Sequence, residues 1–596
     1  MSKFTLTMIA SVLLAIVAAC TRPAAPQPAD EVLKNGKVYT ANPNQPWAQA
    51  VAIRGGKIVA VADDAAMTAW IGSKTKVVDL NGGMLMPGLI DSHVHPLAGG
   101  RQMTLADIGG GHVTLPQFKA FVDEAIASGK ALHEGRVVIV GVHPSMWSEN
   151  LGAIFNKPPY TARPTLFAGS DAHTAWANQP MLQVLGISRE SLAAMPAEKR
   201  KDYSVDSAGE PTGFAVEAGA SNLFRGLPGR DGRYERAWGE TAVRYLNSHG
   251  VTALLEANAG HPSSDGEAIL KLYQDLAQSG DLTLRVSALL EAQSSQELPE
   301  IYRLRDKYSG LPNFSVVGVK LFADGIVDYP AQTAAVLTPY IGTGGTGALK
   351  IEPAEMARIV TDAERHDMLV HIHAIGDRAV RVALDSIEAA RKQNPSGTIH
   401  HSLAHLHLIA PPDVPRFKQL GAVASFQLLW ATLDETEQQL IKPYLTPEVW
   451  EEQYAARSLA DAGAIIAGGS DWPVSSGNPW EAIAQAMTRA GPFGVLNEHE
   501  RMSLPRMLDA YTIGAATAAR LQDKVGSIVV GKEADLILLD RNVAALTPEQ
   551  IAQTQVQWTM LGGRIVYRCD ACSNPKAPPQ DSSKDSSQAS SEEVAQ

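Results

Sequence analysis

The stretch LMPGLIDSHVH, residues 85–95, joins an apolar run to a polar motif that contains two histidines. We expect residues 85–90 to form a buried strand, with Asp91-Ser92-His93-Val94-His95 at its carboxyl end. Side chains at positions i and i+2 of a strand point to the same face, so His93 and His95 can converge on one metal ion. The pair alone does not establish a metal site, because core and surface histidines also occur in this spacing.

Short apolar runs recur along the centre of the chain, and each is followed by a segment of helical character. They cover residues 137–142, 252–255, 316–322, 368–372 and 464–467. Apolar strands that alternate with helices indicate a parallel sheet buried on both faces. The long series favours an α/β fold with a (β/α)₈ TIM barrel over residues 87–519, whose active site lies at the carboxyl ends of the strands. Many Pro and Gly turns predict an insertion over the barrel mouth, at about residues 101–228.

Both ends of this central region are rich in short strands. Residues 50–61 indicate a hairpin closed by Gly-Gly, and residues 556–567 repeat that pattern near the C-terminus. We therefore expect one small β-sandwich domain built from both chain ends, from residues 32–86 and 520–568.

The first 20 residues have the pattern of a targeting segment. Residues 4–17 form an apolar stretch too short for an ordinary membrane-spanning helix, and the sequence Val-Ala-Ala-Cys that ends at Cys20 resembles a bacterial lipobox. We expect Cys20 to be lipidated, although a plain signal peptide cut after Ala19 stays open. The Pro- and Ala-rich residues 21–31 predict a tether. We therefore expect the protein in the bacterial cell envelope, facing the periplasm, with a lipid anchor as its membrane contact.

Only three cysteines occur in the 596 residues. Besides Cys20, Cys569 and Cys572 form a Cys-x-x-Cys, and a local disulfide is the expected state outside the cytoplasm. A redox or zinc role would need partners that this end of the chain does not obviously supply. The segment 569–596 is rich in Ser, Pro, Gln and charge, and we expect a disordered tail.

The overall composition is that of a globular protein, with 45% hydrophobic and 19% charged residues. The formal net charge is −12. A net negative chain lacks the excess of Lys and Arg that non-specific binding to phosphate backbones requires. We therefore expect no nucleic-acid partner.

Lys320 lies inside the apolar run 316–322. Burying an unpaired ammonium there would be very costly, and a buried lysine tends to lose its proton. A neutral amine can react with carbon dioxide to form a carbamate, which could bridge two metal ions. The alternative is a barrel lysine paired with Asp324 or Glu256.

Two further apolar runs end in histidines. His371 and His373 share one face of a predicted strand, and His373 is nearer the strand end. His405 lies in a similar position, where it has the rivals His400, His401 and His407.

Asp471 directly follows the apolar run 464–467. A carboxylate at a strand end beside a metal can ligate it and take a proton from the attacking water. The alternative for Asp471 is a helix N-cap.

Several segments carry a resemblance to a known family: residues 86–95, 209–213, 319–325, 373–377, 469–474, 526–528 and 531–536. Over about residues 32–568 the chain resembles the amidohydrolase superfamily, and within it amidohydrolase family 3, the N-substituted formamide deformylase-like branch. The resemblance implies a barrel with a small β-sandwich made from both chain ends. It also implies a centre of one or two divalent cations, zinc first, held by His93, His95, Lys320 as a carbamate, His373, His405 and Asp471.

These observations predict a metal-dependent hydrolase that cleaves a non-peptide C–N bond, of amide type, in a small molecule. A deaminase, or a hydrolase of cyclic amides or esters, would use the same centre and stays open. A lipid-anchored binding protein without turnover is a further alternative. The full ligand set argues against it, because catalysis would require Asp471, whereas metal binding alone could persist without it. Weak candidates for substrate contacts are His173, Trp147 and Asn178, and a homodimer stays open.

Overall fold

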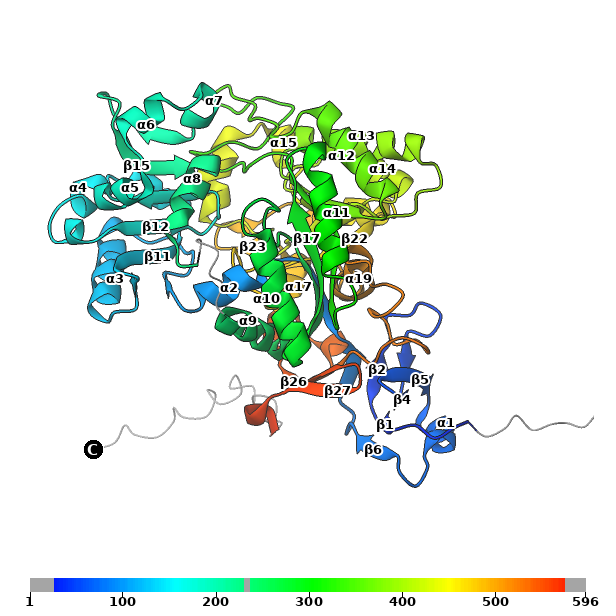
Figure 1. Ribbon diagram of the computed structural model, residues 1–596. Coiled ribbons are helices and arrows are strands. Elements are labelled where there is room, and N and C mark those ends of the chain that lie inside the picture. The colour runs from blue at the N-terminus through cyan, green and yellow to red at the C-terminus, as the bar shows by residue number, and fades with distance from the viewer. Residues whose placement is uncertain (1–25, 230–235, 574–596) are drawn as a thin grey trace, which may run out of the picture.

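The computed structural model describes residues 26–229 and 236–573 (Figure 1). Cys20 and the rest of the predicted signal peptide lie outside these ranges, as do residues 574–596 of the predicted tail. Within the described ranges, no helix is long and apolar enough to cross a membrane. Figure 1 shows a central barrel, a β-rich domain below it and an additional α/β layer at one side.

The centre of the fold is a barrel of eight parallel strands in the order β22-β21-β20-β19-β18-β17-β16-β8. The two end strands of this order lie next to each other, so the barrel is nearly closed. The backbone N of Asp471, just beyond β22, donates a hydrogen bond of 2.7 Å to O of His93 in β8. The strands are β8 (Leu89–Val94), β16 (Val251–Glu256), β17 (Arg285–Glu291), β18 (Phe314–Phe322), β19 (Leu369–Ala374), β20 (Ser402–His405), β21 (Val423–Phe426) and β22 (Ile465–Gly468). The predicted α/β barrel is confirmed.

Helices cover the outside of the barrel and bury one face against it. In α13 (Asp377–Gln393) the buried apolar residues recur at three- and four-residue spacings, which is the period of a helix packed on one side: Ala379, Val380, Ala383, Leu384, Ile387 and Ala390. The other long covering helices are α9 (Arg236–Ser248), α10 (Gly266–Ser279), α11 (Leu298–Lys307), α12 (Pro353–Arg365) and α17 (Pro479–Thr488).

The apolar stretch 85–90, expected as one strand, is divided between two sheets. Residues Met84–Pro87 form β7 of the β-rich domain, and the first barrel strand, β8, begins at Leu89. Gly88 lies at the junction, where a Cβ atom would come within 2.1 Å of Thr252 Oγ1. Only glycine allows the chain to pass this close to β16. His93 consequently lies inside the barrel strand, and His95 lies just beyond its end.

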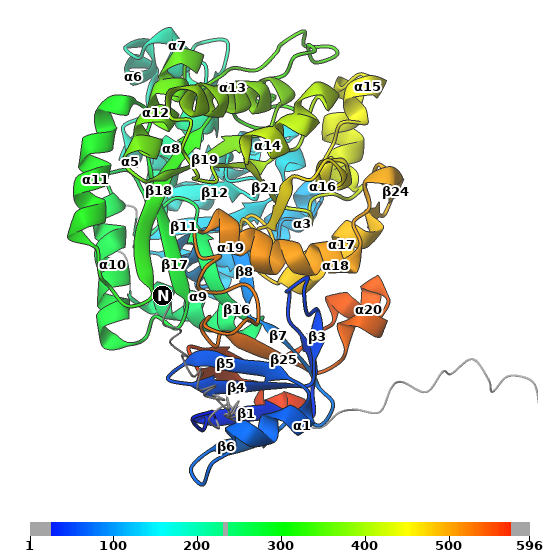
Figure 2. The ribbon, with the colours of Figure 1, turned by 90° about the vertical axis from the view of Figure 1, so that its right-hand side faces the viewer.

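The β-rich domain is built from strands of both chain ends, as predicted. One sheet has the order β27-β26-β25-β7-β2-β3 and the other β5-β4-β1-β6. A buried cluster that includes Leu33, Val51, Leu85, Leu536 and Trp558 fills the space between them. The strands are β1 (Glu31–Lys34), β2 (Lys37–Tyr39), β3 (Trp47–Ala48), β4 (Ala50–Arg54), β5 (Lys57–Ala62), β6 (Lys76–Asp79), β7, β25 (Leu536–Leu539), β26 (Val556–Leu561) and β27 (Arg564–Arg568). Figure 2 shows β7 and β25 at the base of the barrel.

Between β8 and β16 the chain forms a separate sheet, here called the insertion sheet, in the order β10-β11-β12-β13-β15-β14, with β9 beside β11. The run 137–142, grouped with the barrel strands in the sequence, belongs to this sheet instead, because it pairs with β12 of the insertion. Its apolar residues are buried on both faces by the insertion's own helices, which makes it resemble a barrel strand. The elements are β9 (Ala106–Asp107), α3 (Leu115–Ala127), β10 (Leu132–His133), β11 (Arg136–Val142), β12 (Thr165–Gly169), β13 (Thr174–Ala177), α5 (Gln179–Leu185), β14 (Tyr203–Val205), β15 (Pro211–Val216) and α8 (Glu217–Leu223).

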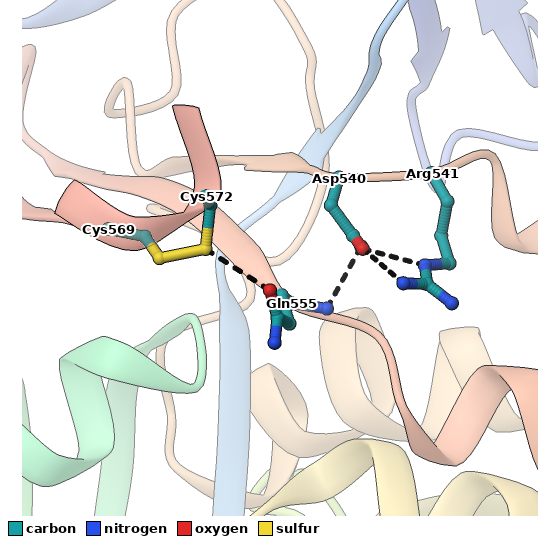
Figure 3. The surroundings of a disulfide bond; sticks show 5 residues. All are labelled: Asp540, Arg541, Gln555, Cys569 and Cys572. Carbon is teal, nitrogen blue, oxygen red and sulfur yellow. Dashed lines mark hydrogen bonds and ion pairs between the residues drawn. A yellow bond between two sulfur atoms is a disulfide. The ribbon is translucent and has the colours of Figure 1, made fainter. Parts of the chain in front are cut away.

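Cys569 and Cys572 form a disulfide beside the last strand (Figure 3). Cys572 Sγ lies 3.3 Å from Gln555 Oε1, and Gln555 N donates to Asp540 Oδ1. Residues Asp570–Ser573 form a 3₁₀ turn, so the first residues of the segment expected to be a disordered tail have regular structure. The disulfide closes this turn against the β-rich domain.

Candidate metal centre

The carboxyl ends of the barrel strands open into a cavity of about 1640 Å³. Both barrel and insertion residues line it: His93 and Asp471 belong to the barrel, and His173, Trp147 and Glu217 to the insertion. The cavity therefore lies where a TIM barrel places its active site, and the insertion supplies part of its wall.

Three buried side chains bring one ligand atom each to within 4.8 Å of one another: His93, His405 and Asp471. His93 belongs to β8, His405 is the last residue of β20, and Asp471 lies in the loop that follows β22. His93 Nε2 lies 3.3 Å from Asp471 Oδ1, and His405 Nδ1 lies 3.9 Å from Asp471 Oδ2. We call these three residues the triad.

The triad fits a divalent metal ion. Within the described ranges, His405 Nδ1 is buried without a hydrogen-bond partner, which is costly for a polar atom unless a ligand takes that place. Two imidazole nitrogens and a carboxylate oxygen are ligands that zinc accepts in catalytic sites with an open position. His405 and Asp471 also have φ angles of 74° and 54°. Such strained backbone conformations cluster at functional sites.

His95 lies beside the triad and contacts its carboxylate. His95 Nε2 is 3.1 Å from Asp471 Oδ1, and on its other side Nδ1 is 3.7 Å from Glu256 Oε1. Glu256 in turn accepts a 2.5 Å hydrogen bond from the Tyr273 hydroxyl. A carboxylate behind a histidine fixes the orientation of its ring, so Glu256 directs His95 Nε2 toward Asp471.

His373 lines the same cavity, and its ring centroid lies 4.5 Å from that of His405. Its Nε2 donates a 2.9 Å hydrogen bond to Gly325 O. The other ring nitrogen, Nδ1, is therefore the atom left to His373 as a metal ligand.

Lys320 is 1% exposed and also lines the cavity. In the described part of the chain it forms no ion pair, and its Nζ lies 4.9 Å from the centroid of the Phe322 ring. The two carboxylates considered as ion-pair partners of Lys320 bind other groups. Asp324 accepts hydrogen bonds from three backbone amides, and Glu256 binds Tyr273 and His95. Burial lowers the pKa of Lys320 to about 8, which increases the fraction of neutral amine.

Two side chains behind the triad were not assigned from the sequence. His371 Nε2 lies 2.7 Å from His93 Nδ1, and His371 Nδ1 lies 2.5 Å from Ser402 Oγ. Asp91 Oδ1 accepts hydrogen bonds from the backbone amides of His93 and Ser470, which ties β8 to the segment that carries Asp471. In the sequence, His371 shares one strand face with His373, and this could have indicated that His371 lies near the metal ligands. No feature of the sequence indicated the hydrogen bonds that Asp91 accepts.

The protonation states of the three triad residues suit metal binding. Burial lowers the pKa of His93 to about 3 and holds the pKa of His405 well below its usual range. Burial alone would raise the pKa of Asp471, but His93 and His95 outweigh it and hold this pKa well below normal. Neutral imidazoles and an ionised carboxylate are the forms in which these side chains ligate metals. Beside the triad, burial alone would lower the pKa of His95, but Asp471 and Glu256 raise it to about 9, so His95 must lose a proton before it can ligate a metal.

The three candidate substrate contacts differ in position. His173 and Trp147 line the cavity, where Trp147 Nε1 donates to Thr174 Oγ1. Asn178 is fully buried away from the cavity: its Oδ1 accepts from the amides of Thr165 and Met181 and so caps α5. The structure removes Asn178 from the candidate substrate contacts, because its amide is used within the insertion.

Comparisons with known proteins agree with this geometry. The family model described as "Amidohydrolase family" matches residues 76–567. The Arabidopsis thaliana "Protein LONG AFTER FAR-RED 3" is 30% identical over 554 residues, covering 90% of this chain and 92% of that protein. The "N-substituted formamide deformylase" of Arthrobacter pascens is 25% identical and is covered to 98%, for 90% of this chain.

A solved structure has the same fold. It is that of an uncharacterized metal-dependent hydrolase from Pyrococcus horikoshii OT3, with a TM-score of 0.67 and 22% identity. The match covers 87% of this chain and 99% of that one.

Proposed function

Since this chain belongs to the amidohydrolase family of metal-dependent hydrolases, we propose that it cleaves a non-peptide C–N bond, of amide type, in a small molecule. The observation that carries the proposal is the triad His93, His405 and Asp471, which lines the cavity. The name of the Arthrobacter pascens relative supports N-substituted amides as the first substrates to examine.

The triad would hold one divalent cation, zinc first. We extend the ligand set to His95, His373 and Lys320 as a carbamate, which would allow a second cation, because all three line the same cavity. When bound, the metal polarises the substrate carbonyl and makes water a nucleophile at neutral pH.

Asp471 is the group of this chain that moves a proton. Its carboxylate is held ionised by His93 and His95 and lines the cavity, so it can accept a proton from the attacking water. The water oxygen bonds to the carbonyl carbon, the C–N bond breaks, and Asp471 passes its proton to the leaving nitrogen. The products are a carboxylate and an amine.

The test is a hydrolysis screen with purified, metal-loaded protein and N-formyl, N-acyl and cyclic amides, followed by the release of amine. We expect turnover of at least one class, and loss of turnover both after chelation and in Asp471→Asn. If fully metal-loaded protein binds small amides but hydrolyses none of these classes, the proposal is wrong and a non-catalytic binding protein is favoured.

We also propose that the protein is attached to the bacterial cell envelope through a lipid on Cys20 and faces the periplasm. The lipobox-like Val-Ala-Ala-Cys and the apolar stretch before it support this proposal.

A further inference from the structure

Glu217 is a buried carboxylate that joins the insertion to the barrel mouth. It begins α8 of the insertion and is 8% exposed. Its Oε2 accepts hydrogen bonds from His173 Nδ1, at 3.1 Å, and from Lys350 Nζ, at 2.5 Å. Its Oε1 accepts from Thr333 Oγ1. One side chain thus binds a histidine of the insertion and two residues of the long connection between β18 and α12 of the barrel.

The backbone of Glu217 also binds His173. Its amide donates a 2.8 Å hydrogen bond to His173 O, and its φ angle is 51°, a conformation that is uncommon for residues other than glycine. Burial would raise the pKa of Glu217, but the positive charges of His173 and Lys350 outweigh burial and lower it. The segment that carries His173 is therefore fixed by both the backbone and the side chain of Glu217.

Gly325 connects this contact to a candidate metal ligand. A Cβ atom at Gly325 would lie 2.1 Å from both Glu217 Oε1 and Thr333 Oγ1. On its other side, Gly325 O accepts the hydrogen bond from His373 Nε2. The backbone at Gly325 is thus packed directly between Glu217 and His373, and any side chain there would displace the carboxylate.

His173 has one ring nitrogen left for the cavity. Nδ1 is bound to Glu217, and no hydrogen bond of Nε2 is present among the described residues. The ring lines the cavity, with its centroid 5.5 Å from that of His373. A ligand in the cavity can therefore reach His173 Nε2 close to the candidate metal centre.

We propose that His173 hydrogen-bonds through Nε2 to the reacting amide of the substrate, and that Glu217 is the positioning residue that holds this histidine. The inference rests on the proposed amide hydrolysis and assigns to the insertion a direct part in it. Through Glu217, this histidine is also tied to Thr333 and Lys350 of the connection between β18 and α12.

The test is a double-mutant cycle with His173→Ala and Glu217→Ala, using kcat and KM for an amide found in the screen. Each single change should lower kcat/KM by about 100-fold, since a small misplacement of a substrate contact has an effect of this size. The double variant should lose no more than His173→Ala alone, because Glu217 acts through that residue. Glu217→Gln, which keeps an acceptor oxygen for Nδ1, should restore most of the activity lost in Glu217→Ala.

The controls separate positioning from folding and from metal loss. Metal content should stay at the wild-type value in both single variants, and the matched controls His133→Ala and Glu190→Gln, elsewhere in the insertion, should retain wild-type kcat/KM. Losses that multiply in the double variant would show that the two residues act independently and overturn the proposal. An unchanged kcat/KM in His173→Ala would overturn it as well.

A binding measurement keeps this inference separate from the proposed reaction. Acetohydroxamate carries a carbonyl and an N–H group and binds metal centres, so its affinity for the metal-loaded protein reports on the same contact without turnover. We expect His173→Ala and Glu217→Ala each to weaken binding by about 10-fold, a change equivalent to one hydrogen bond. If no amide is hydrolysed but this loss is observed, the proposed function fails and the contact stands; equal affinities in all variants reject the contact.

Discussion

Lys320 combines deep burial with the absence of an ionic partner among the described residues. Its Nζ faces a phenylalanine ring and the cavity, while Asp324 and Glu256 are bound to other groups. A charged amine in this position would be poorly compensated, whereas a carbamate would offer oxygen ligands in the cavity that the triad also lines. The structure thus weakens the ion-pair alternative and leaves the bridging role as our proposal.

The corresponding prediction concerns Lys320→Ala. If Lys320 is a bridging carbamate, this variant should lose bound metal and activity together, and short carboxylic acids added to it should restore part of the rate. Elemental analysis and the initial rate with and without acetate are the measurements.

A purely structural Lys320 predicts a different outcome. Breaking a buried ion pair costs roughly 3–5 kcal/mol of stability but would leave the metal in place. Lys320→Ala with full metal content, a lower melting temperature and no rescue by acetate would therefore contradict the carbamate.

Single residues of the site differ in how far the sequence reveals them. His93, His405 and Asp471 lie at or just beyond the carboxyl ends of apolar strands, so their convergence could be predicted from the rule that these ends form the active-site face of a barrel. Glu217 and Gly325 follow no such rule, because they meet across a connection whose path depends on the whole fold. Asn178 was misassigned because an N-cap and a substrate contact require the same side-chain chemistry.

At the level of elements, the continuous chain from β7 through Gly88 to β8 links the β-rich domain to the barrel. Gly88 N donates to Asp535 O, and a Cβ atom at Gly88 would lie 2.1 Å from Oγ1 of Thr252 in the neighbouring strand β16. The position has no space for even a methyl group, and the backbone on both sides is fixed by sheet pairing.

We expect Gly88→Ala to destabilise the protein by about 1–3 kcal/mol, the usual cost of overpacking a core. Gly111→Ala is the matched control, because no atom lies within 4 Å of its Cβ position, and it should change stability by less than about 0.5 kcal/mol. Thermal unfolding of the two variants in parallel is the measurement. Equal melting temperatures would mean that Thr252 moves aside without cost.

The same junction shows what periodicity can and cannot predict. Residues 85–90 form one apolar run, and nothing in the run marks the change of sheet except Gly88. Residues 137–142 are as apolar as a barrel strand because both faces of β11 are covered, so burial alone does not say which sheet a strand joins. The β-rich domain was predictable, because Gly-Gly hairpins recur at both chain ends.

For the whole molecule, the buried neutral histidines predict sensitivity to acid. The pKa of His93 is about 3 in the folded protein and about 6.5 in an unfolded chain, so between these values the unfolded chain binds more protons. Neutral His93 makes its whole contribution to the free energy of unfolding at pH values above its pKa in the unfolded chain. This contribution is lost as the pH falls toward the pKa of His93 in the folded protein. The melting temperature of chelator-treated protein should therefore fall more steeply between about pH 7 and pH 5 than that of His93→Asn. If the melting temperatures of the two proteins fall equally steeply with pH, this explanation is wrong. His366→Asn, at an exposed site, is the control.

Attachment to the membrane depends on Cys20 if the lipoprotein proposal is right. Lipid chains on Cys20 would anchor the protein, since several acyl chains together hold a protein firmly on a bilayer. Cys20→Ala should move the protein from the membrane fraction to the soluble fraction of cells, or mislocalise it. If the variant sediments with membranes as the wild type does, the lipoprotein assignment is wrong.

The pairing of β7 with β25 also sets the order in which the chain can fold. Leu85 is in register with Leu538, so the first half of the β-rich domain must wait until the last part of the chain has been synthesised. Until then β7 remains an open edge, and open edges promote pairing between chains. We expect folding to be completed only after synthesis, and a nascent chain that stops before residue 536 to be prone to aggregation.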